Sequence, residues 1–239
     1  MRLSQAFFLL LLLFCCSISA MSQMDKIKMQ KTQPVKVTSR FKLGFCYSLQ
    51  NTFMPNKDEE NTSGLGPTWK QGNMYGITSG AIFEGDKFSL DFGVLYSTQG
   101  INYSNPTPFY SPITLKYIKI PITLSYAPFR EYHIPLVFTG GFQMSNLVYA
   151  NVDMPNGWYL PGNGVMWFNS TLFDVVWGVG MDIPVSKKIY FDIKVRGDYS
   201  LGDPDNIHQE YMYGSHWKSD RSPTHNITVG ALFGLEYHF

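Results

Sequence analysis

The sequence predicts an all-β fold, an eight-stranded antiparallel transmembrane β-barrel whose strands follow one another in an up-and-down meander. Three observations lead to this prediction. Eight segments alternate between apolar and polar residues, and the connections between these segments are alternately long and short. Aromatic residues also make up 16% of the 239 residues and charged residues only 15%, whereas soluble domains carry about 25% charged residues.

Two segments come before the predicted barrel. Residues 1–22 have the pattern of a signal peptide, with the basic Arg2, an apolar block and then small residues, so cleavage after Ala20 or after Ser22 would fit. A lipoprotein signal is the less favoured alternative, because no small residue stands directly before the cysteines of this segment. Residues 23–39 are polar and lack apolar periodicity, and we interpret them as a polar periplasmic leader.

The barrel domain is predicted over residues 40–239, where apolar residues recur at every second position. Because successive side chains of a β-strand point to opposite faces, a period of two indicates a strand with one apolar face. The pattern is cleanest at the C-terminus, where Ile227, Val229 and Ala231 begin an apolar face that continues to Phe239. The eight predicted strands cover 41–50, 75–84, 88–97, 118–126, 134–143, 173–183, 189–199 and 226–239.

The polarity of the two strand faces favours a membrane barrel over a soluble one. A soluble lipocalin-like ligand carrier would turn its polar face outward, whereas a membrane barrel turns its large apolar face to lipid. Here the apolar face carries almost no charge, and the opposite face is rich in glycine and serine, as a narrow eight-stranded interior requires. Tyrosines near the ends of the apolar faces also fit a membrane interface, namely Tyr47, Tyr75, Tyr96, Tyr126, Tyr199 and Tyr237.

The lengths of the connections predict how the barrel is oriented. Long connections follow the first, third, fifth and seventh strands, and short ones follow the second, fourth and sixth. Outer-membrane barrels have long extracellular loops and short periplasmic turns. We therefore expect the chain to lie in the outer membrane of a bacterial cell, with its signal peptide removed and both ends of the barrel domain in the periplasm.

The last strand also carries a predicted barrel-assembly signal. Outer-membrane barrels commonly end in an aromatic residue, preceded by apolar residues at alternate positions, that the assembly machinery recognises. The residues that fit this pattern are Phe233, Leu235, Tyr237 and Phe239. The expected partners are therefore outer-membrane lipid and, during biogenesis, the barrel-assembly machinery.

Charged residues on the polar strand faces are expected to line the barrel interior. Because buried charges must pair or stay hydrated, we interpret them as an ion-paired network that closes the lumen. A narrow ion path or a binding pocket is the alternative. Asp192 and Glu236 on neighbouring strands could also serve acid–base chemistry, although neutralising Lys194 and Arg196 is the simpler role. The predicted lumen network comprises Lys42, Glu84, Asp91, Lys119, Asp174, Asp182, Asp192, Lys194, Arg196, Asp198 and Glu236.

The predicted loops hold the remaining candidates. His208, His216 and His225 lie in or beside the last long loop, but no recognised catalytic or metal-binding spacing connects them. The sequence therefore predicts no catalytic residue, no metal site and no cofactor, and the net charge of +1 predicts no nucleic-acid partner. Candidate contacts to sugars or to a protein partner are the loop tryptophans Trp69, Trp158, Trp167 and Trp217.

Several short motifs resemble one family when taken in their order along the chain. Residues 115–124 (LKYIKIPITL) are similar to the signature strand of the PorT-like outer-membrane β-barrel family of Bacteroidota-type bacteria. Residues 138–142 (FTGGF) and 177–180 (WGVG) resemble the Gly-rich fifth and sixth strands of that family, and residues 196–202 (RGDYSLG) resemble its arginine-bearing seventh strand. The resemblance covers about residue 40 to residue 239 and implies an outer-membrane barrel. One branch of the family is linked to type IX protein secretion.

The function that the sequence favours is that of an integral outer-membrane barrel without a catalytic site. Such a barrel would act as a structural or binding protein through its extracellular loops or periplasmic turns. Three alternatives stay open: a component of a protein secretion system with a protein partner, an outer-membrane hydrolase or acyltransferase that uses the loop histidines, and the soluble carrier. A passive pore is disfavoured because eight strands leave an interior just wide enough for side chains.

Overall fold

The computed structural model describes most of the predicted barrel domain. The described residues are 40–54, 66–83, 87–104, 112–132, 134–153, 165, 168–204, 211–213, 216–218 and 224–239, and for 211–213 and 216–218 only the backbone is described. The predicted signal peptide and leader lie outside these residues. So do Glu84, Trp158, Trp167 and His208, together with the side chains of His216 and Trp217.

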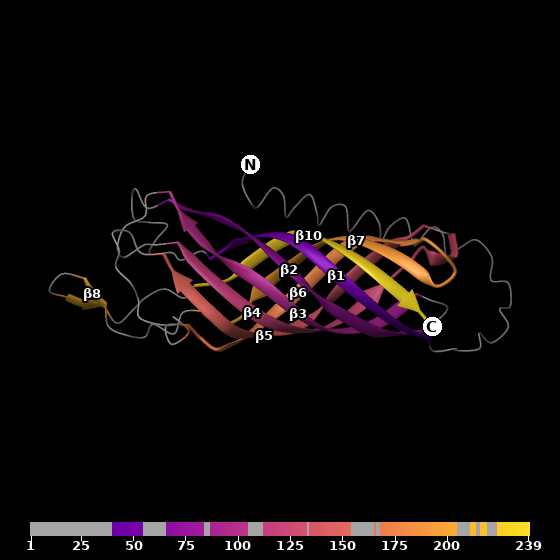
Figure 1. Ribbon diagram of the computed structural model, residues 1–239, viewed down its shortest axis with the longest axis horizontal. Coiled ribbons are helices and arrows are strands. Elements are labelled where there is room, and N and C mark those ends of the chain that lie inside the picture. Colours follow the sequence, from indigo (N-terminus) through magenta and orange to yellow (C-terminus); the bar gives the residue numbers. More distant parts are fainter. Residues whose placement is uncertain are drawn as a thin grey trace, which may run out of the picture. The chain divides into compact units, whose positions relative to one another are not determined.

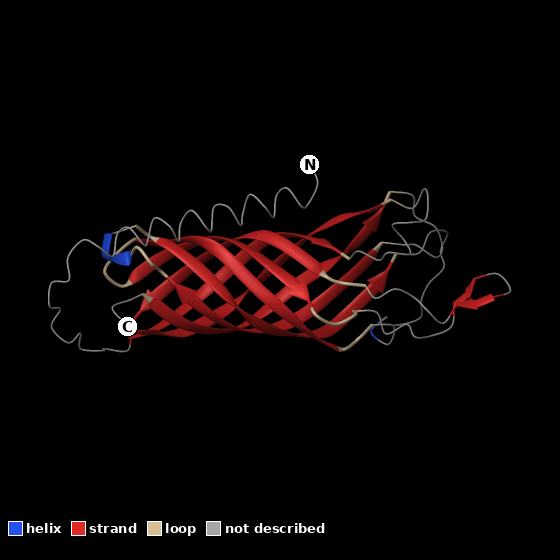
Figure 2. Cartoon of the chain, turned by 180° about the vertical axis from the view of Figure 1, so that it is seen from behind, coloured by secondary structure: helices blue, strands red, loops and turns tan. Residues whose placement is uncertain are grey.

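Eight strands close into one antiparallel barrel, which confirms the predicted fold class (Figure 1). The strands are β1 (Arg40–Phe53), β2 (Pro67–Phe83), β3 (Phe88–Tyr103), β4 (Ile113–Tyr126), β5 (Leu136–Val152), β6 (Thr171–Pro184), β7 (Ile189–Ser200) and β10 (Ile227–His238). Each pairs with its neighbours in this series, and β1 pairs with β10 to close the wall. A short hairpin, β8 (Tyr211–Tyr213) with β9 (His216–Lys218), and one 3₁₀ turn, η1 (Arg130–Tyr132), complete the described elements (Figure 2).

The two ends of the barrel differ as the connection lengths predicted. Short connections at 84–87, 127–135 and 185–188 lie at one end, which we call the turn end. Long connections at 54–66, 104–112, 153–170 and 201–226 lie at the other, which we call the loop end. The start of β1 and the C-terminal Phe239 meet at the turn end, where the Phe239 amide donates a 2.9 Å hydrogen bond to the Phe41 carbonyl. This bond extends the β1–β10 seam to the last residue.

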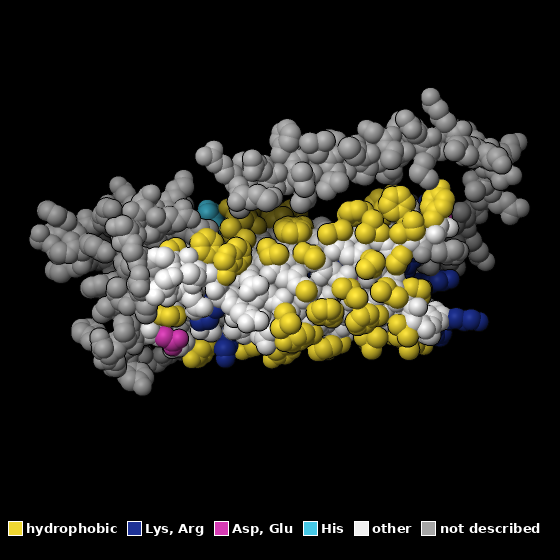
Figure 3. All heavy atoms as spheres, turned by 90° about the horizontal axis from the view of Figure 1, so that it is seen from above, with side chains coloured by type: hydrophobic (Ala, Val, Ile, Leu, Met, Phe, Trp, Pro, Cys, Tyr) yellow, Lys and Arg dark blue, Asp and Glu magenta, His cyan; other side chains and the backbone are white. Residues whose placement is uncertain are grey.

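The outer face of the barrel is an apolar belt (Figure 3). In water such a continuous apolar surface would be strongly unfavourable, so the belt indicates that the wall is surrounded by lipid. Among the described residues, no helix is long and apolar enough to cross a membrane. Exposed side chains of the belt include Phe41, Leu43, Phe45, Ile77, Val94, Ile122, Phe142, Phe173, Val195 and Leu235.

Tyrosines mark the loop-end margin of this belt. The strand register places Tyr47 opposite Tyr75 and Tyr75 opposite Tyr96, so three adjacent strands carry aromatic rings at one level. The rings of Tyr75 and Tyr96 lie 5.5 Å apart. At the turn end Phe88 and Tyr126 stack with 4.7 Å between ring centroids. Aromatic side chains favour the two interfaces of a bilayer, so these levels bracket the hydrocarbon layer.

Four strands, β2 to β5, extend at the loop end by five or more residues beyond the predicted ranges. Beyond the Tyr75–Tyr96 level, β2, β3, β4 and β5 continue as a sheet that we call the upper wall, comprising residues 67–73, 98–103, 113–117 and 147–152. Two register shifts, between Trp69 and Met74 and between Lys116 and Tyr117, interrupt its pairing. A bulge adds one residue to one strand and so breaks the regular alternation of faces. The predicted strands ended near these irregularities for that reason.

The polarity of the two faces is also reversed in the upper wall. In β4, Ile118, Ile120 and Ile122 point outward to lipid, whereas the next inward residues beyond the belt are Tyr117 and Leu115, which are fully buried. In β4 the outward positions of the upper wall, Thr114 and Lys116, are polar instead, whereas Trp69 of β2 and Val148 and Tyr149 of β5 stay exposed. This reversal is expected where a strand leaves the bilayer, because the apolar side chains must then turn away from water.

Candidate functional site

The interior of the barrel is filled in layers, and the layer nearest the turn end is ionic. Lys42 lies on β1 and its ammonium is 3.0 Å from the Asp91 carboxylate on β3 and 3.2 Å from the Glu236 carboxylate on β10. The His238 Nε2 lies 3.3 Å from Oε2 of the same Glu236, and the His238 ring stacks on Tyr190, with 4.0 Å between ring centroids. Lys42, Glu236 and His238 are each buried.

A second ionic group lies beside the first on β6 and β7. Asp182 and Asp192 are direct cross-strand partners, so two carboxylates face each other inside the barrel. Lys194 lies between them, 2.9 Å from Asp192 and 3.6 Å from Asp182. Arg130, from the 127–135 connection, approaches Asp182 at 3.8 Å. Like charges directly opposite each other are unfavourable without such cations, so Lys194 is what makes this register of β6 and β7 acceptable.

The middle layer connects walls that are far apart in the barrel. Lys119 of β4 forms a 2.7 Å ion pair with Asp198 of β7, although β5 and β6 lie between these strands in the wall. Arg196 holds the second oxygen of Asp198 at 3.0 Å and also donates a hydrogen bond to Gln143 of β5. Gln143 in turn donates to Asp174 at 2.8 Å. The exposed fractions of Lys119 and Asp198 are 1% and 4%, so the pair is fully enclosed.

Amide side chains form the next layer towards the loop end. Gln99 of β3 donates a 2.9 Å hydrogen bond to Thr228 of β10, and Asn226 donates to the Gln99 carbonyl oxygen at 2.6 Å. Gln50 of β1 donates to Ser97 of β3 at 2.7 Å. The bonds of Gln99 span the lumen, because β1 and β2 separate β3 from β10 in the wall.

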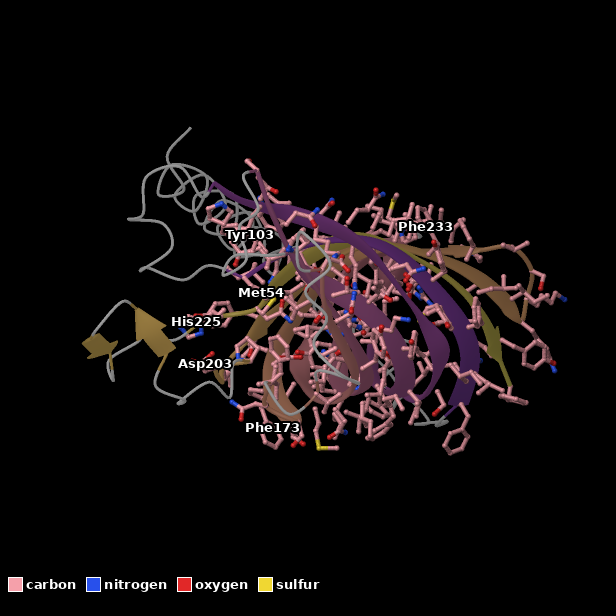
Figure 4. The ribbon with its side chains drawn as sticks, turned by 60° about the vertical axis from the view of Figure 1, so that its left-hand side comes forward. Met54, Tyr103, Phe173, Asp203, His225 and Phe233 are labelled. Carbon is pink, nitrogen blue, oxygen red and sulfur yellow. The ribbon has the colours of Figure 1, made fainter. Side chains whose placement is uncertain are left out.

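The last layer, inside the upper wall, is an apolar core that the sequence analysis did not predict. We expected small polar groups to fill the interior throughout, and the phase reversal at the membrane boundary explains the difference. Figure 4 shows Met54 and Tyr103 at the loop end, with Phe173 and Phe233 on the outside of the wall. The buried members of this core are Met54, Ile101, Tyr103, Leu115, Tyr117, Leu147, Ala150, Phe168 and Leu172.

The space left between the layers is small. A cavity of about 70 Å³ lies among the charged side chains of the lower and middle layers, including Asp91, Asp192, Arg196 and Glu236. This volume has room for only a few water molecules. A smaller cavity of about 20 Å³ lies at the turn end, beside Lys42 and Arg130. Neither cavity is large enough for a ligand of ordinary metabolite size.

The structure places every described member of the predicted lumen network inside the barrel. The expected pairing is different in detail, because Arg196 is bound to Asp198, and Glu236 is bound to Lys42 and His238. Among the described residues, no group of three or more His, Cys, Asp or Glu side chains could hold a metal ion. Gln50, Gln99 and Gln143 contribute to the interior and were missed because neutral amides carry no charge signal. Arg130 was missed because it lies in a connection, where strand periodicity predicts nothing.

The loop-end candidates are only partly described. Trp69 was predicted in a loop, but it lies in β2, where its ring is half exposed and stacks on Phe53 with 5.3 Å between centroids. The prediction was wrong because the bulge beside Trp69 hides the strand. His225 precedes β10 and stacks on Tyr199 at 5.4 Å. Within the described part of the chain, no carboxylate forms a hydrogen bond or ion pair with His225. The described residues therefore show no histidine–carboxylate pair of the catalytic kind at this position.

The chain is similar to several solved structures, each at low sequence identity and with a TM-score below 0.5. Neisserial surface protein A (NspA) has a TM-score of 0.47 and 13% identity, covering 84% of this chain and 99% of that chain. OprG from Pseudomonas aeruginosa has a TM-score of 0.44 and 12% identity, covering 84% and 95%. Ail of Yersinia pestis has a TM-score of 0.41 and 8% identity, covering 83% and 98%.

The sequence comparisons identify no family for this chain. No protein-family model matches it, so the resemblance to the PorT-like family has no support from that comparison. No curated protein matches it either. The described residues form an eight-stranded antiparallel β-barrel with an apolar outer belt.

Proposed function

We propose that this protein is a closed outer-membrane barrel that acts as a surface-exposed binding protein through its upper wall. The observation that carries the proposal is the filled interior, in which ionic, amide and apolar layers follow one another from the turn end to the loop end. A lumen filled in this way leaves no path for solutes. The feature that remains for function is the upper wall, a folded sheet that stands clear of the apolar belt.

The shape of the upper wall supports a binding role. A wall that served only to anchor loops would end at the level of the lipid headgroups, as β6 nearly does. Instead β2 to β5 continue beyond it, and their apolar core makes the projection rigid. The half-exposed Trp69 ring on this wall stacks on Phe53, which gives a partner a flat aromatic surface to contact.

A second candidate, a component of protein secretion, is favoured by the turn end. Three large apolar side chains are exposed there outside the belt: Tyr132 (58%), Ile134 (49%) and Val185 (65%). Exposed apolar patches on a folded protein often mark sites of protein contact. A secretion component of the kind implied by the PorT-like resemblance would use such a surface for a periplasmic partner.

Cysteine labelling on intact cells tests the location and the orientation together. In a Cys46→Ser background, we expect Gln71→Cys on the upper wall to react with a membrane-impermeant maleimide on intact Gram-negative cells. Lys187→Cys in the 185–188 turn should react only after the outer membrane is opened, because that turn would face the periplasm. Both positions are exposed to solvent in the structure. Equal labelling of the two variants on intact cells would contradict the orientation, and recovery in the soluble periplasmic fraction would contradict the location.

Conductance tests the closed lumen. We expect the purified barrel, reconstituted in a planar bilayer, to show no single-channel steps, because eight-stranded interiors are filled by side chains and this one is filled along its length. A large porin added to the same bilayer controls for fusion. Reproducible unitary steps from the folded protein would show that the layers open, and the lumen would then be the functional site.

A further inference from the structure

Lys116 occupies a defined level on the outer face of the barrel. It lies on β4, one outward position beyond Ile118, where the lipid-facing residues end. Its cross-strand partners are Thr98 on β3 and Tyr149 on β5, and its ammonium lies 4.8 Å from the centre of the Tyr149 ring. Because the inward residue Tyr117 belongs to the apolar core, Lys116 lies where the polarity of the faces reverses, which is the level of the lipid headgroups.

A second ammonium reaches the same face of β4 from β2. The Lys70 side chain passes over Gly100 of β3, since a Cβ built on Gly100 would lie 3.1 Å from the Lys70 Cδ. Gly100 also has a φ of 150°, and a side chain there would collide with the Ile113 carbonyl. The Lys70 ammonium donates a 2.7 Å hydrogen bond to Thr114, which is two residues beyond Lys116 on the same strand face. Two cations from different strands therefore approach neighbouring positions of β4.

Within the described residues, Lys70 and Lys116 form no ion pair. In the described part of the chain, the ion pairs of basic residues belong to the lumen and the turn end, and none involves Lys70 or Lys116. Asp153 is the carboxylate that acts on Lys70 from a distance, and it accepts a 2.6 Å hydrogen bond from Asn151. Figure 3 shows basic side chains beside the loop-end margin of the apolar belt.

We propose that Lys70 and Lys116, with Thr114 between them, bind the phosphate groups of an outer-leaflet lipid. Ammonium groups bind phosphate as point charges, and the hydroxyl of Thr114 adds a neutral donor. The acyl chains of such a lipid would lie on Ile118, Ile120 and Ile122 directly below. The site is on the outer face of the wall, so it is independent of whether the lumen is closed, and it lies on the same upper wall that we propose as the binding surface.

Native mass spectrometry of the full-length protein in detergent tests this site. The probes are lipid A with two phosphates and the same lipid A after removal of both phosphates. For wild-type protein we expect preferential retention of the phosphorylated lipid. Each basic residue near an anionic lipid surface changes affinity by about fivefold, so Lys116→Gln should weaken binding by about fivefold and the Lys70→Gln/Lys116→Gln pair by about 25-fold.

Lys187→Gln is the matched control, because it removes the same charge from the exposed turn at the opposite end of the barrel. It should leave retention of the phosphorylated lipid unchanged. A heat-dependent shift in gel mobility shows that each variant is folded. The proposal is overturned if the folded double variant keeps its affinity within twofold, if dephosphorylated lipid A binds wild type equally well, or if Lys187→Gln weakens binding as much as Lys116→Gln.

Discussion

Replacing Asp198 with alanine is expected to lower the free energy of unfolding by about 3–5 kcal/mol, the usual cost of breaking a buried ion pair by removing one partner. Asp198 is the shared counter-ion of Lys119 at 2.7 Å and Arg196 at 3.0 Å. Its loss leaves two buried cations without a carboxylate in the middle of the barrel. Urea titration of the barrel reconstituted in vesicles, followed by the gel-mobility shift, measures the change.

Two comparison variants separate charge burial from a general loss of packing. Glu131→Gln breaks the Lys87–Glu131 pair at the turn end, where the Glu131 side chain is 64% exposed, and should change stability by less than about 1 kcal/mol. The combined variant Lys119→Met/Arg196→Met/Asp198→Leu replaces the three charges by apolar groups and should recover most of the loss, since buried ion pairs are often replaceable in this way. A loss below about 1 kcal/mol for Asp198→Ala would mean that water screens the middle layer.

The cross-lumen bonds have a role that strand pairing alone cannot fill. Backbone hydrogen bonds fix each strand to its two neighbours, but they do not relate β4 to β7 or β3 to β10. The Lys119–Asp198 pair and the Gln99–Thr228 bond do so directly. A change of register by one residue would turn these side chains out to lipid. The layers therefore select one closed barrel among the alternative registers of the same strands.

Much of this arrangement could be predicted from the sequence, because a period of two fixes the face to which each side chain points. This period of two was enough to identify all eight strands and to place Lys119 and Asp198 on inward faces. It could not predict that these two residues meet. Which inward side chains meet across the lumen depends on the tilt and stagger of the barrel, and both are properties of the closed wall.

The upper wall was missed for a different physical reason. The criterion used for a strand was an apolar outward face, which holds only where lipid surrounds the wall. Beyond the bilayer Ile101, Leu115 and Leu147 point inward, and in β4 the outward residues become polar. The alternation continues in β4 with its polarity reversed. A search for such a reversal next to a girdle tyrosine would have found both the extension and its apolar core.

Tyr117 lies at this reversal, and its replacement by alanine is the second large effect that we expect. The Tyr117 side chain is fully buried, and it packs in the apolar core one inward position beyond Lys119. Removing a buried aromatic ring costs about 3–5 kcal/mol when the surroundings cannot collapse into the space. The residues around Tyr117 are held in place by strand pairing, so they cannot close the space. We therefore expect the free energy of unfolding, measured by urea titration in vesicles, to fall by an amount in that range.

The conservative variant Tyr117→Phe keeps the ring and should lose less than about 1.5 kcal/mol, the usual limit for a substitution that conserves volume. Tyr117→Ala should still form no channel, because the amide layer of Gln99, Thr228 and Asn226 and the Lys119–Asp198 pair fill the lumen below it. If the alanine variant keeps full stability, the upper wall is not a packed extension of the barrel. If it conducts ions, the apolar layer alone closes the lumen, and the polar layers beneath it are open to water.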